Sequence, residues 1–223
     1  MAKSFDEKWD EIYDDGKQIN QFPFSDLISF FYNNYKKNSS KLNILEVGCG
    51  AGNNLEFLAN LGHNVFGIDA SEKIIEYTKK NFFDKNLSGN FSVNEFTELP
   101  FNDNYFDLII NRAAICHTDL KSANSAISEC NRVINENGFF YSTFFTNFNT
   151  FKANKIDFGF YDKFDDGFQN IGALKFYNIF EITKLFEDHN FKIVDIFLNE
   201  KIDMKNIPTK INSEWIIHCN KNK

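Results

Sequence analysis

Residues Ile44–Asn53 read ILEVGCGAGN, an apolar run that passes directly into three closely spaced glycines. Glycine has no Cβ, so a strand that ends in glycines can turn tightly and bring its backbone close to a ligand. The next residues, 55–61, have a helical pattern, and the first turn of a helix offers free N–H groups. The stretch therefore predicts a strand, a ligand-binding loop and a helix.

A second short strand ends in an acid that supports this interpretation. Residues Val65–Asp69 read VFGID, and they place Asp69 about 20 residues after the glycines, where an alternating fold presents a carboxylate to ribose hydroxyls. NAD would also fit these two features. However, Asn53 occupies the third glycine position of the dinucleotide fingerprint, and Glu46 would repel a pyrophosphate. A cofactor with an amino group and no phosphate, such as S-adenosylmethionine, is favoured.

The rest of the chain alternates short apolar strands with helices, which is typical of a parallel sheet covered on both faces. We expect helix 120–134 to be ended by Asn137 and Gly138. The predicted fold is α/β, Rossmann-like, with a seven-stranded, mostly parallel sheet, helices on both faces and an antiparallel last strand. The expected strands are 42–47, 63–68, 90–93, 106–110, 139–145, 191–198 and 215–219, and the helices that follow the glycines are 55–61, 71–82, 120–134 and 179–189.

Two segments depart from this alternation, but neither is separated by a linker. Residues 1–40 predict an N-terminal helical cap, broken near Gly16–Pro23. Residues 147–178 contain many Asn, Asp and Gly residues and aromatics, and they predict an inserted loop that covers the top of the sheet. We therefore expect a single domain over residues 1–223.

Composition excludes several classes of protein. The formal net charge is −7, and the chain has no basic run that would bind a nucleic acid backbone. No stretch approaches the ~20 apolar residues of a membrane span, so we expect a cytoplasmic protein with no membrane partner. The four cysteines are scattered without a C-x-x-C pair, and they predict neither a metal site nor disulfides. A small-molecule substrate is expected.

Three motifs, in order and at normal spacing, resemble the class I S-adenosylmethionine-dependent methyltransferase family, type 11-like. They are EVGCGAG at residues 46–52, GIDAS at residues 67–71 and EFTELPF at residues 95–101. The resemblance covers residues 41–145 most strongly. It implies S-adenosyl-L-methionine as the cofactor and methyl transfer as the activity.

The resemblance also implies roles for individual residues. Gly48 and Gly50 would line the methionine group and Asp69 would hold the ribose hydroxyls. The Glu95 side chain, longer than the aspartate common in the family, and the Phe96 N–H would contact adenine. Asn111 would contact the cofactor through its backbone. The full predicted cofactor-binding set is Trp9, Tyr13, Glu46, Gly48, Cys49, Gly50, Asp69, Ala70, Glu95, Phe96 and Asn111.

The N-terminal segment WDEIYDDG, residues 9–16, is similar to the leading helix of small methyltransferases of bacterial surface-polysaccharide clusters. That similarity implies a helix that caps the cofactor. Trp9 and Tyr13 lie one turn apart and could face the sulfonium or the methionine group. The alternative is that both are core aromatics of an amphipathic helix.

Two residues near the end of the fourth strand are candidates for chemistry. His117 could act as a general base, or it could serve only a structural role. Arg112 could bind an anionic acceptor, or it could form a surface salt bridge. The predicted function is O-methylation of a sugar, phosphate or phosphoramidate acceptor in capsule polysaccharide biosynthesis, with 147–178 as the acceptor-side lid. The alternatives are an NAD-dependent oxidoreductase and a catalytically silent cofactor-binding protein.

Overall fold

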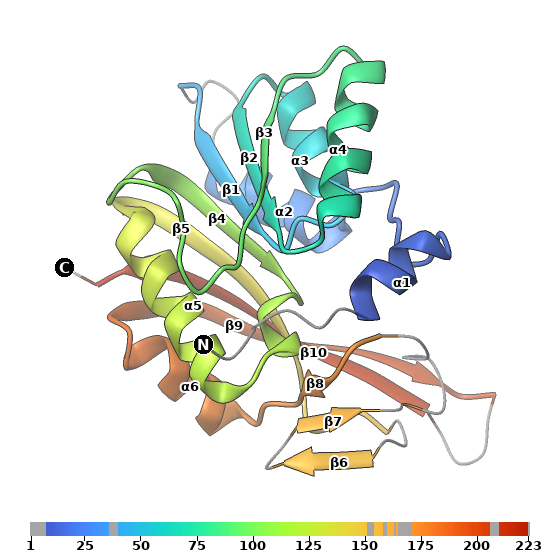
Figure 1. The fold of residues 1–223 in the computed structure, drawn as a ribbon. Coiled ribbons are helices and arrows are strands. Elements are labelled where there is room, and N and C mark those ends of the chain that lie inside the picture. The colour runs from blue at the N-terminus through green and yellow to red at the C-terminus, as the bar shows by residue number, and fades with distance from the viewer. Residues whose placement is uncertain are drawn as a thin grey trace.

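A computed structural model describes residues 8–35, 40–150, 154–157, 160–162, 164, 171–205 and 210–222. In this part of the chain, the central sheet has seven strands in the order β3-β2-β1-β4-β5-β10-β9 (Figure 1). The predicted fold class is confirmed. The strands are β1 (Asn43–Val47), β2 (Asn64–Asp69), β3 (Asn90–Val93), β4 (Phe106–Arg112), β5 (Ile134–Phe145), β9 (Phe191–Asp203) and β10 (Lys210–Lys221).

Strand direction follows the prediction as well. The pairs β1–β2, β1–β4, β2–β3 and β4–β5 are parallel. The last strand, β10, is antiparallel to both β5 and β9. The carboxyl ends of β1, β2 and β4 therefore meet at one edge of the sheet, which is where ligands bind in open α/β folds.

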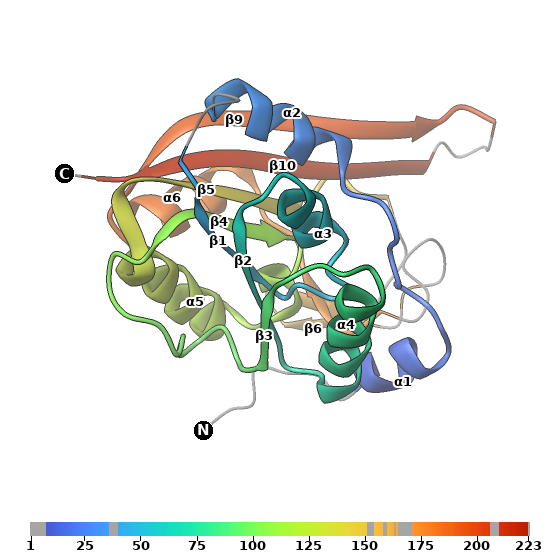
Figure 2. The ribbon, with the colours of Figure 1, turned by 90° about the horizontal axis from the view of Figure 1, so that it is seen from above.

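Helices cover both faces of the sheet, and Figure 2 shows α3 and α4 on one side of the strands and α5 on the other. Because side chains alternate along a strand, Ile109 of β4 faces one hydrophobic core while Leu108 and Ile110 face the other. The first core includes residues of α5 and α6, and the second includes residues of α2, α3 and α4. The helices are α1 (Lys8–Asp14), α2 (Ser25–Asn34), α3 (Asn53–Asn60), α4 (Glu72–Asp84), the 3-10 helix η1 (Ile115–His117), α5 (Leu120–Val133) and α6 (Ile179–Glu187).

The expected end of the helix at Asn137 and Gly138 is wrong, because α5 ends at Val133 and β5 begins at Ile134. Ile134 already pairs with Phe106, and the register of β4 and β5 shifts after this pair. A Cβ on Gly138 would lie 3.0 Å from the Asp107 carbonyl oxygen. Gly138 thus allows close approach of two strands and does not end a helix.

The inserted segment was predicted as a loop, and this is wrong for three short stretches. β6 (Asn154–Asp157), β7 (Phe160–Asp162) and β8 (Leu174–Lys175) form a small antiparallel sheet (Figure 1). Aromatic residues with high β propensity account for β7, where the Tyr161 ring lies 5.5 Å from that of Phe176. Residues 151–153, 158–159, 163 and 165–170 of the predicted lid lie outside the described residues, as do 1–7 and 36–39 of the predicted cap. The single-domain assignment stays a prediction.

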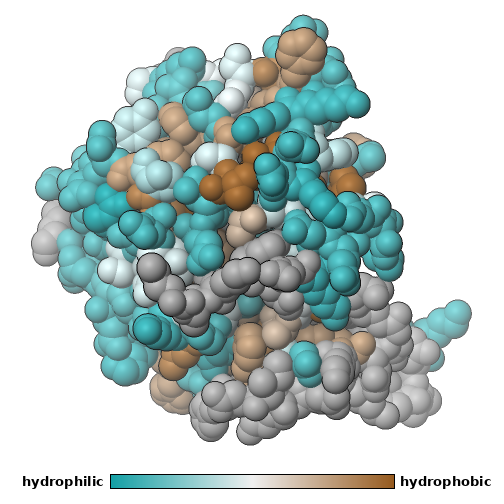
Figure 3. All heavy atoms as spheres, viewed as in Figure 1, coloured by the Kyte–Doolittle hydropathy of each residue, from teal (hydrophilic) through white to brown (hydrophobic). Residues whose placement is uncertain are grey.

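The face of the molecule in Figure 3 is mostly hydrophilic, and its hydrophobic side chains form separate groups. Among the described helices, none has the length and apolar character needed to cross a membrane.

Candidate functional site

A cavity of about 400 Å³ lies at the carboxyl ends of β1, β2 and β4, within the usual range for small-molecule sites. Apart from Asn111, every predicted site residue lines it. Its described lining residues are Trp9, Tyr13, Gln18, Asn20, Phe24, Glu46, Gly48, Cys49, Gly50, Ala51, Asn53, Asn54, Asp69, Ala70, Glu95, Phe96, Arg112, Ala113, Ala114, His117, Thr118, Phe145, Ile171, Lys201, Asn212 and Glu214.

The glycine loop between β1 and α3 has no space for a side chain at two positions. Gly48 and Gly52 have φ angles of 67° and 73°, in the left-handed region. A Cβ on Gly48 would lie 2.2 Å from the Cβ of Ala114, and one on Gly52 would lie 2.7 Å from the Thr78 methyl group. The loop thus brings backbone close to the turn that follows β4.

Asp69 ends β2 and joins two loops of the cavity. Its carboxylate accepts hydrogen bonds from the N–H groups of Gly50 (3.1 Å) and Ser71 (3.0 Å). Burial raises the pKa of Asp69 to about 6, although these hydrogen bonds oppose the increase. The carboxylate thus borders the cavity and the glycine loop together, as a ribose-binding acid would.

Glu46 presents a buried carboxyl group to the cavity. Its Oε1 accepts a hydrogen bond from Asn54 Nδ2 (2.7 Å), whereas Oε2 has no partner among the described residues. Burial raises the pKa of Glu46 to about 8, against the opposing effects of Asn54 and Arg112. A cation in the cavity would stabilise the ionised carboxylate. These two acceptor groups, Asp69 and Glu46, therefore fit a ligand that carries a ribose and a positive charge.

Helix α1 closes one side of the cavity with two aromatic rings. The Trp9 and Tyr13 ring centroids are 5.7 Å apart, and burial, followed by Asp69, raises the pKa of Tyr13 well above its ordinary value. Trp9 also packs against the hydrophobic core, so the capping and core interpretations are both compatible with its position. Ion pairing of Asp14 with Lys73 and a hydrogen bond from Ser71 to Asp10 hold α1 against α4.

Sequence reasoning missed the two asparagines that attach the segment after α1. Asn53 Nδ2 donates to the Phe22 carbonyl (2.7 Å), and the Phe24 N–H donates to Asn54 Oδ1 (3.1 Å). The only signal in the sequence was Asn53 itself, where a dinucleotide fingerprint has Gly or Ala. The first turn of α3 therefore holds the segment that carries Phe24, a residue of the cavity wall.

Asn111 is buried and does not line the cavity, but its side chain shapes the turn that leads to η1. Its Oδ1 accepts hydrogen bonds from the N–H groups of Ala114 and Ile115, each 3.0 Å, and its Nδ2 donates to Ser142 Oγ (2.7 Å). The predicted backbone contact with the cofactor stays a prediction.

Arg112 forms a largely buried ion pair instead of a surface one. Its Nη2 lies 2.9 Å from Glu214 Oε2, and the two side chains are only 15% and 13% exposed. Nη1 donates to Thr143 Oγ1 (3.0 Å), and Cζ lies 4.1 Å from the centroid of the Phe24 ring. Glu214 comes from the other end of the chain, and no sequence pattern indicated it.

His117 lies in η1 with its ring against Trp9, the two centroids being 4.9 Å apart. Nδ1 lies 3.1 Å from the Ala173 carbonyl oxygen. Because a carbonyl can only accept, Nδ1 donates, and in the neutral imidazole Nε2 is then the basic nitrogen.

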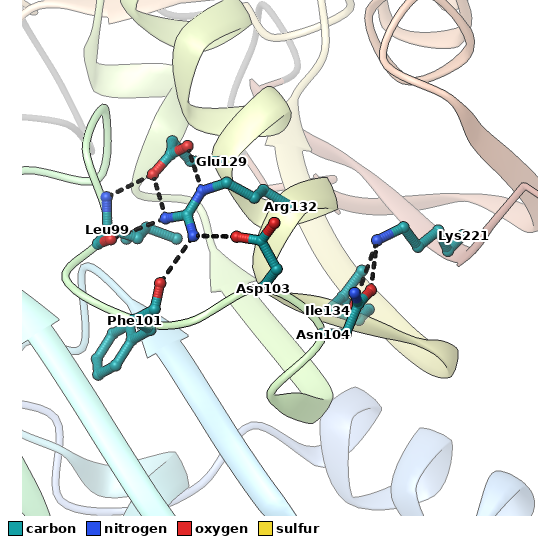
Figure 4. Close-up of polar contacts among 8 residues, drawn as sticks. All are labelled: Leu99, Phe101, Asp103, Asn104, Glu129, Arg132, Ile134 and Lys221. Atoms are coloured by element: carbon teal, nitrogen blue, oxygen red, sulfur yellow. Dashed lines mark hydrogen bonds and ion pairs between the residues drawn. The ribbon is translucent and has the colours of Figure 1, made fainter.

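Glu95 and Phe96 follow β3 and line the cavity. The loop after them is fixed by Arg132, which donates to the carbonyl oxygens of Leu99 (2.9 Å) and Phe101 (2.7 Å) (Figure 4). Glu129 accepts from both Arg132 and the Leu99 N–H. This network holds the ELPF motif against α5.

Comparisons with known proteins agree with this geometry. Residues 45–142 match the family described as Methyltransferase domain. An uncharacterized methyltransferase of Schizosaccharomyces pombe is 29% identical over 108 residues, 40% of this chain and 74% of that protein. A ubiquinone biosynthesis O-methyltransferase of Mesorhizobium japonicum is 29% identical over 100 residues, 45% of this chain and 39% of that protein.

Among solved structures, a SAM-dependent methyltransferase from Methanosarcina mazei superposes with a TM-score of 0.74 at 20% identity, over 90% of this chain and 99% of that one. At this identity the likeness shows the fold. Residues 45–142 therefore form a methyltransferase domain, and the domain and its fold imply S-adenosyl-L-methionine as the cofactor. The chain is an S-adenosylmethionine-dependent methyltransferase.

Proposed function

We propose that the chain methylates an oxygen atom of a small-molecule acceptor, with His117 as the general base. The observation that carries this proposal is the Nδ1 contact with the Ala173 carbonyl, because it makes Nδ1 the donor and Nε2 the basic nitrogen of a ring that lines the cavity. A hydroxyl acceptor needs such a base, whereas a neutral amine needs little help.

The cofactor would be held by the residues that the motifs predicted. Glu46 would bind the ammonium of the methionine group, Asp69 the ribose hydroxyls, and Glu95 and Phe96 the adenine. The wall around the cofactor would consist of backbone and small side chains, from Gly48, Cys49, Gly50 and Ala70. The rings of Trp9 and Tyr13 would cover the cofactor. The buried Glu46 carboxyl with an unpartnered oxygen among the described residues supports this arrangement.

Bound S-adenosylmethionine supplies a methyl group on a sulfonium, which is already a good leaving group. The protein therefore contributes mainly by positioning the acceptor and excluding water. Phe24, whose N–H donates to Asn54, lines the cavity, and His117 Nε2 would take the proton of the acceptor hydroxyl.

The pathway we propose is surface-polysaccharide synthesis, supported by the resemblance of residues 9–16. The NAD alternative is disfavoured by the antiparallel β10. A catalytically silent protein would have a closed acceptor pocket, whereas the cavity wall here also includes residues outside the predicted cofactor set, among them Asn212 and Glu214 of β10.

Isothermal titration calorimetry with S-adenosylhomocysteine and with NAD, each offered separately, tests the cofactor. We expect binding of S-adenosylhomocysteine only. Binding of NAD alone would refute the proposal. A screen of nucleotide-activated sugars and phosphorylated metabolites with methyl-labelled S-adenosylmethionine then tests the acceptor.

A further inference from the structure

One face of the sheet carries a row of polar side chains beside the cofactor loops. Arg112 ends β4 and pairs in register with Thr143 of β5. Across the next strands, Glu214 and Asn212 lie two residues apart in β10 and so point to the same face. Lys201 of β9 lies directly opposite Asn212. Arg112, Asn212, Glu214 and Lys201 all line the cavity.

The positive charge of Arg112 is already compensated. Glu214 contacts both Nη1 and Nη2, Thr143 accepts from Nη1, and Phe24 lies against the guanidinium. An anionic acceptor that approached Arg112 would meet the Glu214 carboxylate as well, and like charges repel at this range. Lys201 is exposed, so its ammonium is well hydrated and holds an anion only weakly.

The protein groups on this face that can still form hydrogen bonds are acceptors, and they would bind donors of a ligand. Asn212 lines the cavity, and its Oδ1 is buried without a hydrogen-bond partner among the described residues. A carboxylate accepts about four hydrogen bonds, so Glu214 can accept from a ligand in addition to Arg112. A buried acceptor without a donor costs free energy, which a ligand hydroxyl would recover.

We infer that Glu214 and Asn212 bind the hydroxyl groups of an uncharged, polyhydroxylated acceptor, such as a sugar or cyclic polyol, on the β5–β10–β9 side of the cavity. This inference rests on the proposed function and narrows the class of acceptor. Among sugar and phosphate acceptors, it favours one that presents uncharged hydroxyl groups to Glu214 and Asn212. Arg112 then acts as a positioning residue that holds the Glu214 carboxylate.

The test is methyl transfer from methyl-labelled S-adenosylmethionine to glucose, galactose and myo-inositol, to their phosphate monoesters, and to benzylamine. We expect transfer to an uncharged polyol in preference to its phosphate ester. Glu214→Gln and Asn212→Leu should each raise KM for that polyol by roughly 10-fold or more, with kcat at saturation less affected. Asn212→Leu leaves the Arg112 ion pair intact, so it tests the site even where Glu214→Gln unfolds the protein.

Glu200→Gln is the matched control, because Glu200 is exposed and neighbours Lys201 on the opposite face of β9; its KM should equal that of the wild type. Calorimetry with S-adenosylhomocysteine should give each variant a Kd within about twofold of the wild type. Preference of the wild type for phosphate esters, transfer to benzylamine alone, or no transfer to any hydroxyl compound would overturn the inference. In Glu214→Gln a shift toward phosphate esters is expected, because Arg112 then lacks its compensating carboxylate. Loss of S-adenosylhomocysteine binding by the wild type would instead refute the proposed function.

Discussion

His117 Nδ1 contacts the Ala173 carbonyl of the inserted segment, and its ring lies nearly perpendicular to that of Trp9. Both contacts fix the ring orientation, so a basic nitrogen is oriented before any acceptor binds. A general base works best when its position does not have to be found during the reaction.

Replacement of His117 by Gln should therefore lower kcat by about 100-fold or more and leave the Kd for S-adenosylhomocysteine nearly unchanged. Steady-state kinetics with the acceptor found by the screen provide the measurement. His189→Gln is the control, because His189 makes the same kind of contact with a carbonyl, that of Leu185. Equal kcat values for His117→Gln and the wild type would assign His117 a structural role only.

At the scale of elements, the loop between β1 and α3 is fitted to the turn after β4. Gly48 and Ala114 are 66 positions apart in the chain and lie in contact. The Ala114 methyl group fills the space between them, so Gly48 has no room for a side chain. The loop and the turn therefore keep their separation only with this pair of small residues.

Gly48→Ala should destabilise the protein through two separable causes, a clash with Ala114 and a left-handed φ that costs about 1–2 kcal/mol. The double variant Gly48→Ala/Ala114→Gly removes the clash and keeps the φ cost. Urea denaturation should thus show the double variant to be more stable than Gly48→Ala and less stable than Ala114→Gly. A double variant as unstable as Gly48→Ala would contradict the contact.

Arg132 fixes the loop after Phe96 through several acceptors at once (Figure 4). Lysine cannot reproduce this planar set of bonds, so Arg132→Lys should lower the free energy of unfolding by about 1–2 kcal/mol. Chemical denaturation measures it, with Lys221→Arg, which changes a neighbouring surface cation, as the control. Unchanged stability would mean that the loop is held by its apolar residues alone.

The sequence predicts those features of the fold that are set by residues close together in the chain. The apolar runs of β1 and β4 and the acid at Asp69 are each visible within a few residues of sequence. The hydrogen-bond and ion-pair partners of the site residues could not be predicted in this way. Apart from the pair of Asn54 and Glu46, they come from distant segments of the chain. Glu214 is 102 positions from Arg112, and nothing in a polar strand such as β10 indicates which arginine it meets. The strands β6 to β8 were missed because each is only two to four residues long.

At the scale of the whole molecule, two buried carboxyl groups of the cavity are costly to ionise while no ligand is bound. The pKa of Glu46 is raised to about 8 and that of Asp69 to about 6, in both cases mainly by burial. The folded protein therefore binds more protons than the unfolded chain between pH 5 and pH 8. A group of this kind loses its contribution to stability as pH rises toward the folded pKa.

Glu46→Gln removes the larger of these ionisations. We expect the stability of the ligand-free variant, relative to the wild type, to increase by more than about 1 kcal/mol between pH 5 and pH 8. Saturating S-adenosylhomocysteine, whose ammonium would stabilise the carboxylate, should reduce this difference. Thermal and urea denaturation at several pH values measure both effects. A difference independent of pH would show that Glu46 is ionised throughout.

Phe24, Arg112 and Glu214 meet at one point although they come from the first, middle and last parts of the chain. During synthesis on a ribosome, residues 45–142 emerge long before Glu214 does. A nascent chain can thus complete its cofactor loops while Arg112 still lacks its carboxylate partner. β10 also carries Asn212 and Glu214 of the proposed acceptor site, so we expect ribosome-stalled chains that end before β10 to bind S-adenosylhomocysteine without transferring a methyl group.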